Sequence, residues 1–394
     1  MKFFIINNLF EPYSRGGTER VVKIISQSLA KRGQVVLITS SPHQDKVEEK
    51  DGLKICRFKP KNFYYPLDDQ AQSYFKKFFW HLRDLGACGL RRKLKKLIKE
   101  EKPDVILTHN LKGLGLGLFR TVRQSKILHC HTLHDYQLLE PHGSMFRNGR
   151  NSKMKGFFYQ LYRLITRRLI NSPEAIIAPS KFVLDKHLTY GFFKKSVKKL
   201  VLPNPVAVNF PLLFRQKSDY LRVVYLGQVE EHKGVEFLTD AFRRFNDRRF
   251  KLDIYGGGSR LKNVKTLAEG GQRITVHGPI GYEKLDELFA QTDVLVVPSV
   301  WWENSPTVIY EAYLHKVPVI VSDAGGAKEL VINGQTGWLF KSGDTQDLIE
   351  KLKLALREKI TLPQMGRNGF NLIDDFMADK YGAKIVDLCR QLKS

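Results

Sequence analysis

Short apolar runs alternate along the first half of the chain with segments whose apolar residues recur at helical spacing. Lys2–Asn7 and Gln34–Thr39 have the length and composition of buried strands, and Thr18–Lys31 between them repeats apolar residues every three or four positions. This order predicts a β-α-β unit, which requires parallel strands. Further strands are predicted at Val105–Thr108, Ile127–His131, Ala175–Ala178 and Lys199–Leu202.

Two prolines interrupt the alternation at 202–205, and it resumes after Tyr220. The second half predicts a helix at Val235–Phe245 and strands at Leu221–Leu226, Phe250–Tyr255, Arg273–His277, Val294–Pro298 and Pro318–Ser322. We therefore expect an α/β fold of two Rossmann-like, doubly wound domains that face a cleft. The N-terminal domain spans residues 1–205, the C-terminal domain spans 206–375, and a last helix at about 376–394 crosses back to the first domain. Ligand sites in such sheets lie at the carboxyl ends of the strands, where the strand order reverses.

Charge separates the two halves. The chain carries a net charge of +25. Residues 1–205 hold 39 Lys and Arg against 16 Asp and Glu, whereas residues 206–394 hold 26 against 24. A basic first half indicates an anionic partner, which could be membrane headgroups, a phosphorylated acceptor or nucleic acid, although a merely soluble basic surface remains an alternative. No recognition helix, RNP-like motif or zinc finger is present in the sequence, so we expect no nucleic acid partner.

Three segments of the first half bear on membrane contact. Leu90–Lys99 and Phe157–Ile170 are basic and amphipathic, and Tyr74–Trp80 is rich in aromatic residues. Each helix alone could simply pack on its own sheet, but together the segments favour peripheral contact with an anionic membrane. No apolar run approaches the ~18 residues of a membrane span. We expect a cytoplasmic protein, peripherally bound at the inner face of the membrane, with four scattered cysteines reduced and no zinc site.

The strongest candidate site is the segment Pro298–Ala312. A strand ends at its start, and a helix is predicted to begin near Asn304 or Ser305, with Pro306 in the first turn. Such a helix start has free backbone N–H groups, here at Ser305, Thr307 and Val308. They form a site for the anionic diphosphate of a nucleotide.

Two carboxylates flank this helix start. Glu311, about one and a half turns into the helix, is placed to accept hydrogen bonds from two ribose hydroxyls. Glu303, before the helix, could hold sugar hydroxyls or stabilise positive charge on a sugar ring. A solvated helix face is the ordinary alternative for a single glutamate, but it leaves the neighbouring tryptophans and proline unexplained.

The segment resembles the E-x7-E signature of the retaining GT-B glycosyltransferases of family 4, in the subgroup with a W-x-E-N-S-P core. The resemblance extends over essentially the whole chain. It also rests on Gly16-Gly17-Thr18-Glu19, Thr132-Leu133-His134-Asp135-Tyr136, Ala178-Pro179-Ser180, Pro203-Asn204, Gly227-Gln228 with Lys233-Gly234, Tyr255-Gly256-Gly257-Gly258, Gly325-Gly326 with Glu329, and Gly334 with Gly337.

The resemblance implies a metal-independent hexosyltransferase that needs no cofactor beyond its nucleotide-sugar co-substrate. The donor would be a UDP- or GDP-sugar. The basic charge and the aromatic residues of the first half favour a saccharide or lipid-linked acceptor in bacterial envelope polysaccharide, capsule or lipopolysaccharide synthesis. No D-x-D metal motif stands out, which agrees with the expected metal independence.

The resemblance also assigns roles to residues. His134, Glu303 and Lys233 would be catalytic: His134 orients the donor sugar, and Lys233 places a positive charge at the diphosphate. Gly16 and Gly17 would approach the donor or the acceptor, and Ile280 would lie at the base. Gln228 stands where many relatives carry an arginine, so one cation is missing from the expected site. The departing phosphate would itself take the acceptor proton, on the same face of the sugar.

Two other classes remain open. A nucleotide-sugar epimerase or a phosphorylase could use a similar two-domain cleft, although no lysine motif for pyridoxal phosphate is evident. A non-catalytic, transferase-like binding protein is the second alternative. The joint presence of Lys233, Glu303 and Glu311 argues against an inactive protein.

Overall fold

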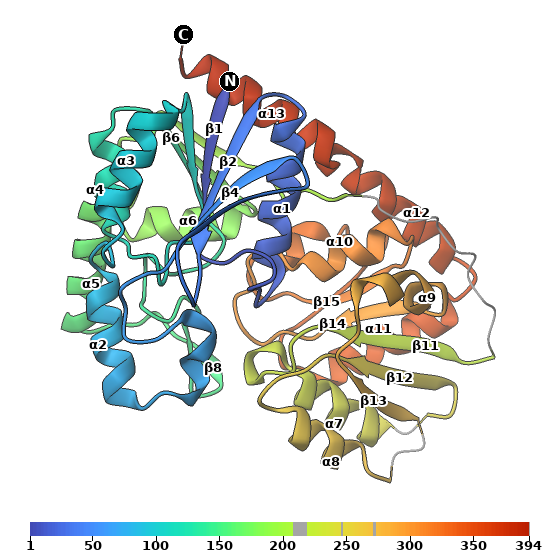
Figure 1. Cartoon of the computed structure of the whole chain (residues 1–394). Coiled ribbons are helices and arrows are strands. Elements are labelled where there is room, and N and C mark those ends of the chain that lie inside the picture. Colours follow the sequence, from blue (N-terminus) through green and yellow to red (C-terminus); the bar gives the residue numbers. More distant parts are fainter. Residues whose placement is uncertain (208–218, 246, 271–272, 394) are drawn as a thin grey trace. The chain divides into compact units, whose positions relative to one another are not determined.

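The computed structural model describes residues 1–207, 219–245, 247–270 and 273–393. The chain divides into two compact units, each of which contains its own β-sheet (Figure 1). The first unit comprises Met1–Met145, Lys153–Ala207 and Phe376–Ser394, and the second comprises Phe146–Ser152 and Val208–Asp375. The segment Phe146–Ser152, which the sequence places in the first domain, therefore belongs to the second unit.

The first unit contains an eight-stranded sheet in the order β10-β9-β6-β5-β1-β2-β4-β3, in which only the edge strand β3 is antiparallel to its neighbour. Its strands are β1 (Lys2–Ile6), β2 (Gln34–Ser40), β3 (Lys46–Lys50), β4 (Leu53–Phe58), β5 (Val105–Thr108), β6 (Leu128–Thr132), β9 (Ala175–Ala178) and β10 (Lys198–Val201). Its helices are α1 (Gly17–Ala30), η1 (Pro66–Ala71), α2 (Tyr74–Asp84), α3 (Arg91–Glu101), α4 (Leu118–Gln124), α5 (Phe157–Ile170), α6 (Lys181–Thr189) and α13 (Ala378–Gln391).

The C-terminal helix α13 packs beside α1 on the first sheet (Figure 1). Val22, Ile25 and Leu29 of α1 share one buried core with Tyr381 and Ile385 of α13. The last helix thus completes the first unit's core, although the whole second sheet separates it from that unit in sequence.

The second unit contains a six-stranded parallel sheet in the order β13-β12-β11-β14-β15-β16. Its strands are β11 (Leu221–Leu226), β12 (Phe250–Tyr255), β13 (Ile274–Gly278), β14 (Val294–Val297), β15 (Val319–Ser322) and β16 (Gly337–Phe340). Its helices are η2 (Glu231–Lys233), α7 (Val235–Phe245), α8 (Leu261–Ala268), η3 (Tyr282–Lys284), α9 (Leu285–Ala290), α10 (Thr307–Leu314), η4 (Ala327–Leu330), α11 (Thr345–Arg357) and α12 (Leu362–Ile373). η5 (Asp374–Phe376) links α12 to α13, and a hairpin of β7 (Phe146–Arg147) and β8 (Arg150–Asn151) completes this unit.

The fully buried parallel strands agree with the sequence prediction, because each is a continuous apolar run. Within the described residues, no helix has both the length and the apolar character that a membrane span requires. The four cysteines are all free and buried.

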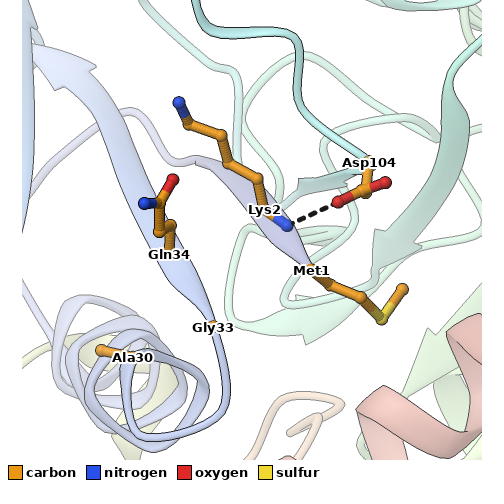
Figure 2. Close-up of a pocket in the computed structure, with 6 residues that line it drawn as sticks. All are labelled: Met1, Lys2, Ala30, Gly33, Gln34 and Asp104. Carbon is orange, nitrogen blue, oxygen red and sulfur yellow. Dashed lines mark hydrogen bonds between the residues drawn. The ribbon is translucent and has the colours of Figure 1, made fainter.

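One hollow in the first unit has a volume of about 460 Å³ and lies at the amino ends of β1 and β2 (Figure 2). Met1, Lys2, Gly33, Gln34 and Asp104 line it together with Ala30, and the Lys2 backbone N–H donates to Oδ2 of Asp104 over 2.7 Å. Ligands of open parallel sheets bind at the opposite, carboxyl edge. This hollow therefore lies at the other end of the first sheet's strands from the loops after β5 and β6.

Candidate functional site

The second sheet reverses its order at β11, because β12 lies on one side of that strand and β14 on the other. Loops that leave the carboxyl ends of β11 and β14 therefore diverge at this point, which is where doubly wound sheets bind ligands. Lys233 follows β11, and Glu303 follows β14. Their side chains meet in an ion pair, with 2.7 Å between Nζ of Lys233 and Oε1 of Glu303.

Glu303 is held from several directions. The Ser299 hydroxyl donates to Oε1 of Glu303 over 2.6 Å, and the Gly326 N–H donates to the Glu303 carbonyl over 2.6 Å. Gly325 has φ +73°, and a Cβ there would meet the Glu303 backbone at 2.3 Å, so this close approach requires glycine. The residue is 4% exposed. Its backbone and side chain are thus both fixed at the edge of the sheet.

The carboxyl of Glu303 is ionised in this setting. Burial acts to raise its pKa, but the positive charge of Lys233 and the hydrogen bonds from Lys233 and Ser299 outweigh burial, so the pKa is lowered. The buried carboxylate and its lysine together leave little net charge at this point of the site.

Lys233 is positioned by aromatic and backbone contacts. Its Nζ lies 5.1 Å from the centre of the Trp301 ring, and the His232 ring contacts that same ring at 4.9 Å. Gly234 has φ +70°, and a Cβ there would lie 2.0 Å from the Pro298 carbonyl oxygen. The glycine after Lys233 therefore allows the loops after β11 and β14 to touch.

The hairpin of β7 and β8 supports the same loop from the other side. The Asn151 side chain donates to the Val300 carbonyl over 2.9 Å and accepts from the Trp302 N–H over 2.8 Å. These two bonds hold the backbone on both sides of Trp301. Sequence reasoning missed Asn151, because nothing in the sequence connects a polar hairpin at 146–152 with a loop about 150 residues later.

α10 begins later than the sequence predicts. It starts at Thr307, and Pro306, with φ −67° and ψ 121°, occupies the N-cap position without a side-chain cap bond. Neither Asn304 nor Ser305 is the cap, because the extended conformation of Pro306 keeps both residues outside the helix. The Ser305 hydroxyl instead pairs with the Tyr310 hydroxyl at 2.7 Å.

Glu311 lies in the second turn of α10 and is 7% exposed. Its carbonyl accepts from Nδ1 of His315, whose Nε2 pairs with Asp286 at 2.6 Å. The N–H groups of Thr307 and Val308 precede the first intrahelical bonds of α10. The helix start, Glu311 and the Lys233–Glu303 pair all follow strand β11 or β14.

The two remaining predicted residues of the second unit also follow strands at the carboxyl edge. Gln228 follows β11, and its carbonyl accepts from the Tyr225 hydroxyl over 2.6 Å. Ile280 follows β13 and is partly exposed. Thus every candidate residue predicted in the second half of the chain lies in a loop that follows a strand of the second sheet or in the first two turns of α10.

The first unit carries the other three predicted residues. Gly16 and Gly17 stand at the start of α1, where Oε2 of Glu19 accepts the Gly16 N–H over 2.9 Å. His134 follows β6, and its Nε2 lies 2.8 Å from Nδ1 of His109, which follows β5. The two imidazole rings are stacked, with 5.0 Å between their centres. Sequence reasoning missed His109, although its place directly after a predicted strand was a usable signal.

Buried imidazoles surround this pair. Burial lowers the pKa of His134 and of His129 to about 3, and it lowers the pKa of His109 and of His131 well below the usual value. Thr108 contacts Nε2 of His129 at 2.7 Å and Nδ1 of His131 at 2.9 Å. These histidines are neutral at physiological pH, so His134 is a hydrogen-bonding group there and not a cation. In the described part of the chain, no group of three or more His, Cys, Asp or Glu side chains is placed to hold a metal ion.

Two family models together match nearly the whole chain. Residues 15–210 match the model of Glycosyltransferase Family 4, and residues 214–372 match the model of Glycosyl transferases group 1. An uncharacterized 42.6 kDa protein in the cps region of Klebsiella pneumoniae is 28% identical over 84% of this chain and 87% of its own length. The capsular polysaccharide biosynthesis glycosyltransferase CapM of Staphylococcus aureus is 20% identical over 77% of this chain and 80% of its own.

Solved structures share the fold. Sucrose-phosphate synthase from Thermosynechococcus elongatus aligns over 100% of this chain and 99% of its own with a TM-score of 0.78 and 20% identity. HepE of Anabaena in complex with UDP-glucose aligns over 99% and 100% with a TM-score of 0.72 and 17% identity. The chain has the GT-B fold and belongs to the glycosyltransferases, with a Family 4 domain followed by a group 1 domain.

Proposed function

We propose that this protein is a retaining glycosyltransferase that moves a hexose from a nucleotide-sugar to a saccharide or lipid-linked acceptor. The observation that carries the proposal is the Lys233–Glu303 pair at the switch point of the second sheet, beside the start of α10. Family membership supports transfer chemistry over the epimerase and binding-protein alternatives.

The donor binds the second unit in this proposal. Glu311 accepts hydrogen bonds from the ribose hydroxyls, the N–H groups around Ser305–Val308 face the diphosphate, and Ile280 lies beside the base. The structural neighbour HepE binds UDP and UDP-glucose, so a UDP-sugar is the first donor to test. Gln228 adds a hydrogen bond but no charge, which leaves Lys233 as the cation that the motif directs to the diphosphate.

The chemical step breaks the bond between the anomeric carbon and the diphosphate oxygen and forms a bond to an acceptor hydroxyl. Negative charge develops on the leaving diphosphate, where Lys233 and the amino end of α10 stabilise it. The acceptor proton passes to the departing phosphate, so atoms and charge balance without a protein nucleophile. His134, a neutral imidazole held by His109, orients the donor sugar by hydrogen bonding.

Donor binding in this proposal changes the partners of Lys233 and Glu303. Their side chains form an ion pair, with 2.7 Å between the nitrogen and the oxygen. A diphosphate that arrives near Lys233 competes with Glu303 for the ammonium, and the freed carboxylate then accepts hydrogen bonds from the sugar. Donor binding therefore exchanges one ion pair for two contacts to the substrate.

The relatives in capsule and polysaccharide synthesis suggest the pathway. We place this protein in bacterial envelope polysaccharide, capsule or lipopolysaccharide assembly, with its basic first unit at an anionic membrane. We also propose that transfer requires no divalent metal, because a lysine and a helix start supply the positive charge.

A panel of UDP-, GDP- and ADP-sugars tests the donor by thermal shift, with EDTA present throughout. One nucleotide class should raise the melting temperature, and Lys233→Ala should abolish the shift while Lys262→Ala, an exposed lysine of the same unit, retains it. NMR of the product should then show that the anomeric configuration of the donor is retained. Stabilisation by none of the donors, or an inverted product, would contradict the proposal.

A further inference from the structure

Helices α2 and α5 lie on the same part of the first unit (Figure 1). Both present large apolar side chains to solvent. The Phe78 ring of α2 and the Phe158 ring of α5 lie 6.5 Å apart, although 80 positions separate them in sequence. We call the joint surface the α2/α5 aromatic face. Its exposed members, with their exposed fractions, are Tyr74 (74%), Phe75 (76%), Phe78 (41%), Phe79 (53%), Leu82 (46%), Phe157 (80%), Phe158 (47%) and Leu161 (42%).

This exposure is unusual for the folding of a soluble unit. Burial of one Phe or Leu side chain stabilises a fold by about 1.5–3 kcal/mol, so folding favours structures in which such residues are buried. Here α2 buries Trp80 and Asp84 and half-buries His81, whereas its larger aromatic stripe faces outward. An exposed apolar surface of this extent indicates a binding surface.

Trp80 is not part of the face, contrary to its grouping with Tyr74–Phe79 in the sequence. It is 1% exposed, and its indole N–H donates to the Tyr64 carbonyl over 2.9 Å. Its ring also stacks on Tyr64. Trp80 therefore anchors α2 to the first unit and leaves the other side of the helix available.

The basic helix α3 is not part of the α2/α5 aromatic face, because its apolar residues face inward. Leu90, before its first turn, and Leu94 are each 2% exposed, and the helix packs against α4. Of the three segments that the sequence associates with a membrane, two supply exposed aromatic residues. The third offers only charge.

The exposed charges on α2 and α5 themselves are positive, and the carboxylates that precede α2 are Asp68 and Asp69 in η1. α2 carries one carboxylate, Asp84, which is buried, and α5 carries none. The accessible cations on the two helices and just before α5 are Lys76, Lys77, Arg83, Lys153, Lys155, Arg167 and Arg168. Two copies of this surface would repel each other, whereas anionic lipid headgroups would match both the cations and the aromatic side chains.

We propose that the α2/α5 aromatic face is the surface with which this protein inserts into the interface of an anionic lipid bilayer. Phe75 and Phe157, its most exposed phenylalanines, enter the boundary between headgroups and acyl chains, and the lysines and arginines stay at the phosphates. The inference deepens the proposed function, because it names the part of the first unit that brings a lipid-linked acceptor within reach.

Single labelled positions test the surface. The native cysteines are all buried, so a cysteine introduced at the surface can be labelled with an environment-sensitive fluorophore. Phe75→Cys and Phe157→Cys should both shift their emission to the blue on vesicles that contain phosphatidylglycerol, but not on phosphatidylcholine vesicles. Val197→Cys, which is 76% exposed in the same unit, is the matched control and should not shift.

A second measurement separates insertion from mere charge attraction. The Phe75→Ser/Phe157→Ser double variant should lose at least tenfold in vesicle flotation at low salt, whereas Val197→Ser should float like the parent protein. Unchanged flotation of the double variant, a blue shift at position 197 equal to those at 75 and 157, or a parent protein that forms dimers through this face would overturn the proposal. Melting temperatures report whether each variant folds. Vesicle flotation needs no nucleotide-sugar, so its outcome is independent of the proposed donor site.

Discussion

At the residue scale, the Lys233–Glu303 pair explains why two glycines and two loops converge after β11 and β14. Gly234 and Gly325 each permit a backbone approach that a Cβ would block. The pair joins residues 70 positions apart in the chain. Its chemistry follows from this convergence, because burial would otherwise raise the pKa of the Glu303 carboxyl.

Replacement of Glu303 by Gln should separate nucleotide binding from transfer. The amide releases Lys233 from an opposing charge, so affinity for UDP should stay the same or rise several-fold. The transfer rate should fall by about a hundredfold or more, in the range observed when one stabilising group is removed from an active site. Titration calorimetry with UDP and a transfer assay measure the two effects.

Glu283→Gln is the control, because this glutamate is exposed in the same unit and should affect neither quantity. A parallel loss of UDP affinity and transfer rate in Glu303→Gln would contradict the proposed role of the pair.

The sequence predicted the members of the candidate site better than their contacts. Lys233, Glu303 and Glu311 were identified from motif and resemblance, and each follows a strand at the expected edge. The ion pair, the Ser299 bond and the His109–His134 contact were not predicted, because they depend on how separate loops meet in space. The roles assigned to these residues remain predictions.

At the element scale, prediction worked where a segment reports its environment through its own composition. β5, β9, β11 and β12 begin and end at the predicted residues. β5 and β9 are short runs that their sheet buries completely, whereas β12 alternates and buries Phe250, Leu252 and Ile254. β3, which is largely polar and lies at an edge, was not predicted. β4 and β16 were missed as well, and so was the β7–β8 hairpin.

The hairpin gives a prediction at this scale. Asn151→Ala removes both side-chain bonds that hold the backbone at Val300 and Trp302, so the second unit should lose about 1–2 kcal/mol in free energy of unfolding. Hydrogen exchange of the Trp302 amide should accelerate as well. Urea unfolding and exchange mass spectrometry measure these effects.

Asn263→Ala provides a matched asparagine, because this exposed residue of α8 bonds only to the Glu236 side chain in the described structure. It should change the free energy of unfolding by less than about 0.5 kcal/mol. If Asn151→Ala were equally neutral, the hairpin would not support the loop.

At the scale of the whole molecule, buried neutral histidines make the stability of the first unit depend on pH. Their folded pKa values are lowered, so the unfolded chain binds more protons below about pH 6.5, and stability falls as pH falls from there toward about 3. Three carboxyls of the first unit act in the opposite direction, because burial raises the pKa of Asp84 to about 7, that of Asp135 to about 6 and that of Glu19 above its usual value. The histidines outnumber them; they are His81, His109, His129, His131, His134 and His187.

We therefore expect the melting temperature of the first unit to drop between pH 7 and pH 5. His187→Phe should reduce the proton uptake on unfolding by about one, because burial lowers the pKa of His187 to about 4. A first unit that melts at the same temperature at both pH values would refute this expectation.

The charge division seen in the sequence also acts at this scale. The basic half supplies the α2/α5 aromatic face, whereas the nearly neutral half supplies the residues proposed to bind the donor. We expect vesicle binding and donor binding to be separable by mutation, since different units carry them.

The central claim is that the segment from Glu303 to Glu311 binds a nucleotide-sugar, and calorimetric titration of the stabilising donor tests it most directly. The parent protein should bind one donor per chain. Glu311→Ala should weaken binding by about tenfold to a hundredfold, the effect of losing one or two hydrogen bonds to a carboxylate, while its melting temperature without donor shows that it is folded. Equal affinity of a folded Glu311→Ala variant and the parent protein would contradict the account.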